Sequence, residues 1–92
     1  MEMYNPPHPG KVLDELYLKE LKISISALAL KLGISRDVAE SFVNGACPVT
    51  AEIALRLAKA FHTTPELWLD MQQGYDLWHA KQTVNLDDVQ AM

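Results

Sequence analysis

The sequence predicts an all-α domain of five helices, in which the second and third helices form a helix-turn-helix. Apolar residues recur at helical spacing from residue 9 to residue 78, and no stretch alternates with a period of two for long enough to form a strand. A glycine, Gly33, separates two short amphipathic segments. A chain of 92 residues, 49 % of them hydrophobic, is expected to form one such domain around a single core.

The first helix is expected to run from Pro9 to about Leu21. Proline suits the first position of a helix, because its φ is already helical and its missing N–H has no partner there. Residues 1–8, which contain two consecutive prolines, precede the helix as an extended lead-in. Spacings of three and four residues predict a buried face formed by Val12, Leu13, Leu16, Tyr17 and Leu21.

The helix-turn-helix lies between Ser24 and Thr50. The apolar face of its first helix consists of Leu28, Ala29 and Leu32. Gly33 then stands where a left-handed residue ends a helix, and Ser35 is placed to cap the next one. The buried side of this second helix consists of Ala39, Phe42 and Val43. Such a pair places a recognition helix in the major groove of DNA, although a plain helical hairpin in a small bundle is the alternative.

Seven polar residues of this unit are candidates for DNA contacts because they lie off the apolar faces. They are Lys31, Ser35, Arg36, Asp37, Glu40, Ser41 and Asn44. An arginine can donate two hydrogen bonds to guanine, a glutamate can accept one from cytosine, and an asparagine can donate to a phosphate. Arg36 follows the cap of the second helix, where the N-terminal end of a recognition helix meets base edges, so we expect it to carry most of the base discrimination.

Two more helices are predicted after the helix-turn-helix. The fourth covers Ala51–Phe61 with Thr50 as its cap, and the fifth begins at Pro65 behind Thr64 and reaches about Trp78. Residues 79–92 have modest apolar content and no clear cap, so they are expected to form a C-terminal tail that is frayed or ordered on contact.

The fifth helix concentrates aromatic residues along one edge. A core of this size cannot absorb all of them, and aromatic residues and methionine are enriched at the centres of interfaces. We therefore predict that the C-terminal helix contributes to a homodimer interface, with packing in the core as the alternative. The residues assigned to that interface are Trp68, Met71, Tyr75 and Trp78.

Charge and composition exclude several classes of protein. Eight basic and twelve acidic residues give a net charge of −4, whereas nucleic-acid binders usually carry a basic footprint. The sequence has no apolar run of about 18 residues and no signal-like N-terminus, and its lone Cys47 cannot form an internal disulfide. These features favour a cytoplasmic location for the protein. His8, His62 and His79 lack metal-ligand spacing and are interpreted as surface or cap residues, so no metal or cofactor is expected. No nucleophile with a base can be assembled, so we do not expect an enzyme.

The motifs of the chain resemble those of known helix-turn-helix families. Ala29, Gly33-Ile34-Ser35 and Asn44-Gly45 stand at the spacing of the phage-repressor (XRE-type) domain. His8-Pro9-Gly10, the run ALRLAKAF at 54–61 and the segment PELWL at 65–69 are more specific. With them, the stretch from residue 8 to residue 78 resembles the HigA/VapI family of antitoxins, described as plasmid-maintenance antidote proteins.

This resemblance implies a homodimeric repressor that binds an inverted-repeat operator in double-stranded DNA ahead of its own operon. It also implies neutralisation of a partner toxin of the HigB/RelE type, a ribosome-dependent mRNA endonuclease. Members of the family commonly carry glutamine at the position of Ile25, polar or basic residues at positions 37, 38 and 40, and arginine at positions 46 and 47. This chain has apolar or acidic residues there. Two alternatives therefore stay open: a protein-interaction module that binds a toxin with weak or no DNA binding, and a solitary XRE-type regulator.

Overall fold

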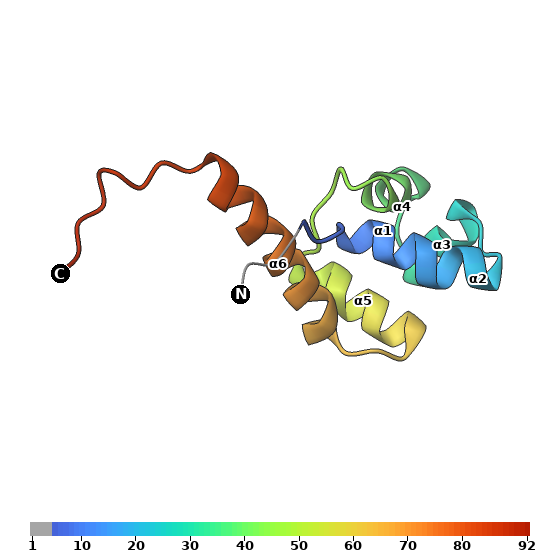
Figure 1. The fold of residues 1–92 in the computed structure, drawn as a ribbon. Helices are drawn as coiled ribbons and strands as arrows, with labels where there is room; N and C mark the ends of the chain where they lie inside the picture. The colour runs from blue at the N-terminus through green and yellow to red at the C-terminus, as the bar shows by residue number, and fades with distance from the viewer. Residues whose placement is uncertain (1–4) are drawn as a thin grey trace.

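The computed structural model describes residues 5–92, so the first four residues of the predicted lead-in lie outside the described part. The helical elements are α1 (Pro9–Leu13), η1 (Asp14–Leu18), α2 (Lys19–Leu21), α3 (Ile25–Leu32), α4 (Arg36–Val43), α5 (Ala51–Phe61) and α6 (Pro65–Thr83). The first three follow one another without a break, so residues 5–92 contain five helical segments and no strand (Figure 1). The predicted all-α fold class is confirmed.

Local sequence signals set the ends of these helices. A serine or threonine hydroxyl oxygen accepts the N–H of the third helical residue at the start of α3, α4, α5 and α6, over 3.1 to 3.3 Å. The capping residues are Ser24, Ser35, Thr50 and Thr64, and the last three are the predicted ones. Gly33 ends α3 with a left-handed φ of 69°, as its position in the turn predicts.

The first helical segment differs from its prediction because η1 is π-helical. Its hydrogen bonds span five residues, as from the N–H of Lys19 to the carbonyl of Asp14. The buried leucines are accordingly Leu13 and Leu18, five residues apart. Leu16 and Leu21 are 63 % and 60 % exposed, so the prediction that they are buried is wrong. Spacings of three and four residues do not describe one face of a helix through a π turn.

The core lies where the helix-turn-helix meets α1, α5 and α6. α3 packs on α4, α5 packs on α6 and against α3, and α1 contacts both α4 and α6. Among the side chains that are completely enclosed are Leu13, Leu28, Phe42, Leu57 and Trp68. α4 is thus held by its apolar side, which leaves its other side to solvent.

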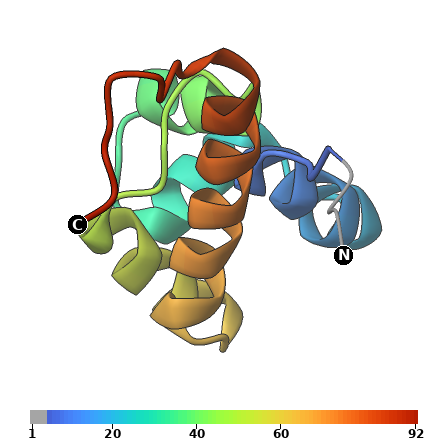
Figure 2. The same ribbon diagram turned by 60° about the vertical axis from the view of Figure 1, so that its left-hand side comes forward.

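The last helix is longer than predicted, because α6 continues to Thr83 rather than ending near Trp78. Residues 84–92 follow without a helix and are exposed. The molecule measures 49 × 23 × 23 Å, and Figure 1 shows the C-terminal half of α6 projecting from the domain. In the view of Figure 2, α6 lies in front of the other helices. No helix within residues 5–92 combines the length and the apolar character needed to cross a membrane.

Two glycines give a matched test of the contact between α1 and α4. A Cβ at Gly10 would lie 1.8 Å from the carbonyl oxygen of Phe42, whereas a Cβ at Gly74 in α6 meets nothing within 4 Å. We expect Gly10→Ala to lower the free energy of unfolding by about 1–3 kcal/mol, because backbone must move. Gly74→Ala is expected to raise it by about 0.5–1 kcal/mol through helix propensity. Urea denaturation of both variants measures the difference, and equal effects would contradict the close approach.

Candidate nucleic-acid interface

α4 presents a polar surface to solvent. Ser35, Arg36, Asp37, Glu40 and Asn44 are exposed, and Ser41 is half-buried. The opposite side of the helix is anchored in the core by Ala39 and Phe42. The structure therefore brings six of the seven sequence-predicted DNA-contact residues together on one helix and at its two ends.

Arg36 is held by a neighbour on α3. Its Nε donates a hydrogen bond to Ser26 Oγ over 3.1 Å. Within the described residues its two Nη groups make no hydrogen bond, so the end of the guanidinium points its donors to solvent. Ser26 was missed by sequence reasoning, because one exposed serine in the first turn of a helix belongs to no recognisable pattern. The pair joins the N-terminal parts of both helices of the motif in one polar surface.

Lys31, the seventh predicted residue, lies elsewhere. It stands in the last turn of α3 and lines a shallow depression together with Leu30, Arg56 and Lys59. Lys31 therefore shares its surroundings with the cations of α5 rather than with the Arg36–Ser26 pair.

Arg56 on α5 secures the turn of the helix-turn-helix. Its Nη1 donates to the carbonyl oxygens of Leu32 and Gly33, over 2.9 and 3.3 Å. Its Nε and Nη2 donate to a carboxylate oxygen of Glu52, one helical turn earlier, over 3.1 and 2.9 Å. The carbonyls at the C-terminal end of α3 have no partner within their own helix, so Arg56 satisfies them from outside. Sequence reasoning recorded Arg56 only as part of a motif, since its partners are 23 and 24 residues away.

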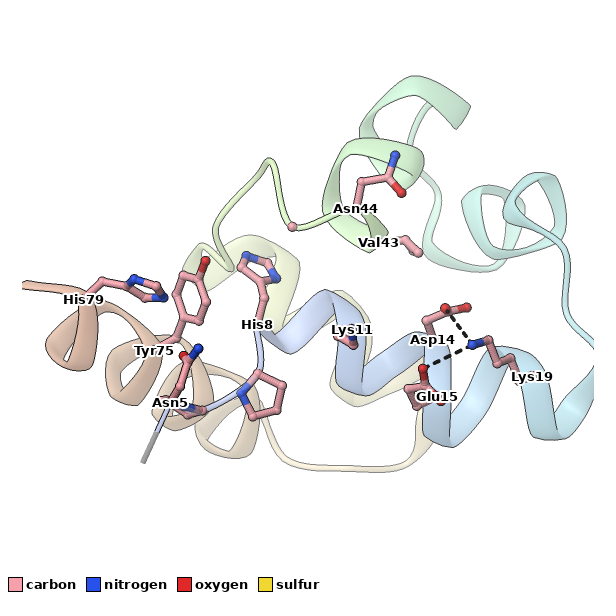
Figure 3. Close-up of a pocket in the computed structure, with 13 residues that line it drawn as sticks. Asn5, His8, Lys11, Asp14, Glu15, Lys19, Val43, Asn44, Tyr75 and His79 are labelled. Atoms are coloured by element: carbon pink, nitrogen blue, oxygen red, sulfur yellow. Dashed lines mark hydrogen bonds and ion pairs between the residues drawn. The ribbon is translucent and has the colours of Figure 1, made fainter. Parts of the chain in front are cut away.

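His8 joins three parts of the chain beside the C-terminal end of α4. It caps α1, since its Nδ1 accepts the N–H of Gly10 over 2.9 Å. Its ring lies edge-on to that of Tyr75, with ring centroids 5.0 Å apart; Figure 3 shows both side chains. It also lies edge-on to the ring of Phe42, with centroids 5.9 Å apart. Burial lowers the pKa of His8 below its ordinary value of 6.5, against a hydrogen bond with the backbone of Cys47 and the charge of Asp76. Its neutral ring keeps Nδ1 able to accept, and the interpretation of His8 as a cap is correct.

Gln72 holds the segment between α4 and α5 from the other side. It is buried on α6, and its Oε1 accepts the N–H of Val49 over 2.8 Å. Its Nε2 donates to Asp76 over 2.9 Å, so both ends of the amide have partners. Through His8 and Gln72, the segment between α4 and α5 is thus attached to both α1 and α6.

The four residues that the sequence assigned to a subunit interface are more buried within their own domain than expected. Trp68 is completely buried, and its Nε1 donates to Thr63 Oγ1 over 2.7 Å. A side chain with no exposed surface cannot contact a second subunit, so the prediction for Trp68 is wrong. Met71 is half-buried against the core, and Tyr75 and Trp78 are half-buried beside His79. Helical spacing alone does not distinguish the core side of α6 from the side next to it.

Charge is unevenly divided between the two parts of the molecule. Five acidic residues and one lysine between 65 and 92 give that segment a charge of −4, which is the net charge of the whole chain. Residues 1–64 are therefore neutral in sum. On α4, Asp37 and Glu40 accompany Arg36, so the exposed side of this helix is weakly acidic.

The comparisons with known proteins agree with this geometry. No model of a known protein family matches the chain. An HTH-type transcriptional regulator of Haemophilus influenzae is 44 % identical over 73 residues, which cover 79 % of this chain and 68 % of that protein. Antitoxin HigA-1 of Vibrio cholerae is 36 % identical over 76 residues, covering 83 % of this chain and 71 % of that protein.

Solved structures extend the match to the whole chain. Antitoxin GraA superposes with a TM-score of 0.92 at 35 % identity, covering 98 % of this chain and 100 % of that chain. The structure of antitoxin GraA in complex with its operator superposes with a TM-score of 0.90, covering 100 % of this chain and 96 % of that chain.

The fold, together with the exposed polar side of α4, defines a helix-turn-helix protein of the transcriptional-regulator class. Within that class, the chain belongs to the HigA/VapI-type family of antitoxins, as its similarity to HigA-1 and GraA shows. The family consists of regulators and antitoxins rather than enzymes, in agreement with the interpretation of the sequence.

Removing the side chain of Arg56 tests its role at the turn. We expect Arg56→Ala to lower the free energy of unfolding by about 1–2 kcal/mol, because charged hydrogen bonds to two carbonyls are lost. Lys59→Ala, one turn later on an exposed side of α5, is the control and should change it by less than about 0.5 kcal/mol. Thermal or urea unfolding measures both, and amide exchange at the α3–α4 turn should accelerate in Arg56→Ala alone. Indistinguishable variants would contradict this role.

Proposed function

We propose that this chain is a sequence-specific DNA-binding repressor that acts as the antitoxin of a HigBA-like toxin–antitoxin pair. The observation that carries the proposal is the exposed N-terminal end of α4, where Arg36 is oriented by Ser26 and its Nη groups face solvent. A guanidinium in this position can donate two hydrogen bonds to a guanine in the major groove. The operator complex of the similar antitoxin GraA supports the same use of the domain.

The other exposed polar residues of α4 have distinct expected roles. Glu40 accepts from a cytosine amino group, Asn44 donates to a phosphate, and Ser41 faces the groove. Ser35 fixes the start of the helix, and Asp37 repels nearby phosphates. Lys31 contributes a phosphate contact from the separate group that it forms with Lys59.

A two-fold homodimer completes the proposal. Two copies place their α4 helices about 34 Å apart, one turn of B-DNA, so the operator is an inverted repeat. The subunit contact lies on α6, where Met71, Tyr75 and Trp78 keep part of their surface exposed. The partner protein is a RelE/HigB-like toxin that cleaves mRNA, as the membership of this family suggests. In this role the protein works in the cytoplasm, at the nucleoid when bound to its operator.

A second candidate function is a protein-binding module with weak or no DNA binding. The exposed carboxylates of Asp37 and Glu40 on the recognition helix favour it, as does the net charge of −4. A solitary regulator without a toxin is the third possibility. A neighbouring reading frame that encodes a small RelE-like protein would favour the antitoxin over the solitary regulator. A gel shift on the upstream DNA would favour either of these two over the protein-binding module.

Arg36 provides the direct test of DNA recognition. Arg36→Ala is expected to weaken binding to the operator by about 1–3 kcal/mol and to relax the preference at one base pair. Ser26→Ala should give a smaller loss in the same direction, because it frees the guanidinium without removing it. Gel shifts on the operator and on single-base variants measure both effects. Unchanged affinity and selectivity in Arg36→Ala would refute this assignment.

The acidic residues of α4 predict an unusual dependence on salt. Few cations stand near the recognition helix, so few counterions are released and the log–log salt slope should be shallow. Asp37→Asn and Glu40→Gln are expected to strengthen binding to random DNA, because they remove repulsion from phosphates. Titrations at several salt concentrations on operator and random duplexes test this. A steep slope for the unchanged protein would instead reveal a basic footprint on other elements.

A further inference from the structure

His8 lies where α1, α4 and α6 meet, and it is enclosed there. The residue is only 7 % exposed. Its ring packs against Phe42 of α4 and against the backbone of Gly45 just after that helix, where an added Cβ would lie 3.6 Å from Cγ of the ring. Tyr75 of α6 contacts the ring edge-on, and His79 stacks on Tyr75 in turn (Figure 3). One side chain therefore contacts both the end of the recognition helix and the last helix.

The hydrogen bonds of His8 give each ring nitrogen a separate role. Nδ1 accepts the N–H of Gly10, in the first turn of α1, over 2.9 Å. A neutral imidazole has one acceptor and one N–H donor, so the proton lies on Nε2, and the ring also forms a hydrogen bond with the backbone of Cys47. An imidazolium has two donors and no acceptor. A proton on Nδ1 would face the N–H of Gly10, and the cap of α1 would be lost.

The first turn of α1 is also the part of this helix that approaches α4. Gly10 leaves no room for a side chain between α1 and the carbonyl oxygen of Phe42. A buried N–H that loses its acceptor is unfavourable, and so is a charged ring in an enclosed position. Protonation of His8 therefore acts against the enclosed position of the ring and against the close contact between α1 and α4.

We propose that His8 is a proton-sensitive positioning residue for the recognition helix. A proton on Nδ1 loosens the attachment of α4 to α1 and α6 and thereby weakens binding to the operator. The inference rests on the DNA-binding part of the proposed function and adds a control to it. Phe42 links the two, because it anchors α4 in the core and its ring lies against that of His8.

The environment of His8 sets the direction of the effect. Burial lowers the pKa of His8 below its ordinary value of 6.5, against the hydrogen bond with Cys47 and the charge of Asp76. The folded protein thus favours the neutral ring. The stabilisation that this ring provides is complete above pH 6.5, and it is lost as the pH falls through the lower pKa of the folded state.

Other titratable groups also face this position. Among residues 5–92, those that line the depression beside His8 are Lys11, Asp14, Glu15, Lys19, Tyr75 and His79. Asp76 and Cys47 act on the ring from α6 and from the segment after α4, and the contact on α4 itself is the uncharged Phe42. Histidine is the residue type that ordinarily titrates between about pH 5 and 8. His79 is therefore the residue whose titration a control must separate from that of His8.

Two substitutions of His8 separate the cap from the proton. For the unchanged protein, we expect the dissociation constant of the operator complex to rise about three- to tenfold from about pH 7.5 to about pH 5.5. His8→Asn keeps an acceptor that does not titrate, so this rise should disappear. His8→Phe keeps an aromatic ring without an acceptor, so at the higher pH it should already bind as weakly as the unchanged protein does in acid. Fluorescence anisotropy at constant ionic strength measures the constants, and circular dichroism verifies folding at both pH values.

His79→Gln is the matched control, because it removes the other histidine of the depression and leaves the cap of α1 intact. It should keep the pH dependence of the unchanged protein. Asp37 and Glu40 are present in every variant, and their protonation removes repulsion from phosphates, so it opposes the expected change. A pH dependence that survives in His8→Asn or disappears in His79→Gln would overturn the proposal. Operator binding that is independent of pH in the unchanged protein would overturn it as well.

NMR of the unchanged protein tests the mechanism without DNA, and it decides alone if a variant at position 8 does not fold. The ring nitrogen shifts of His8 should place the proton on Nε2 at neutral pH. Amide exchange of Gly10 and of α4, relative to the intrinsic rate at each pH, should accelerate as His8 titrates. A proton on Nδ1 at neutral pH, or exchange in α4 that does not respond, would contradict the role of His8. If exchange responds but no complex with the upstream DNA forms at any pH, the coupling between His8 and α4 stands and the DNA-binding function fails.

Discussion

The close approach of α1 to α4 at Gly10 and Phe42 positions the exposed helix of this protein. Only a residue without a side chain allows the backbone of α1 to reach the carbonyl of Phe42. His8 supports the same contact between α1 and α4, because it caps α1 and its ring lies edge-on to the rings of Phe42 and Tyr75. Each residue of the segment His8-Pro9-Gly10 thus has a structural role. His8 caps α1, Pro9 begins the helix, and Gly10 allows the close contact with α4.

Much of the fold follows from local signals in the sequence. The predicted helix ends agree with the structure where a cap or a left-handed residue marks them, as at Ser35, Thr50, Thr64 and Gly33. Each of these residues acts on backbone within a few positions of itself, so a short stretch of sequence is enough to recognise it. The π-helical η1 carries no comparable signal, and periodicity therefore failed at Leu16 and Leu21.

The candidate site was only partly predictable. Exposed positions on α4 follow from helical spacing once Ala39 and Phe42 are assigned to the core. The contacts that hold this helix do not, since Arg56 and Gln72 bind backbone atoms 23 or 24 residues away. Trp68 shows the same limit, because spacing assigned it to the aromatic edge whereas three-dimensional packing encloses it completely.

The hydrogen bond between Gln72 and Val49 has a consequence for communication across the molecule. Gln72 belongs to α6, and Val49 belongs to the segment that leaves α4, so a displacement of α6 acts on backbone close to the recognition helix. A ligand at α6 changes the affinity for a ligand at α4 when both ligands distinguish the same two positions of this segment. By thermodynamic reciprocity, a ligand at α4 changes the affinity at α6 by the same factor. One buried amide thereby connects α6 directly to the backbone that leads from α4 to α5.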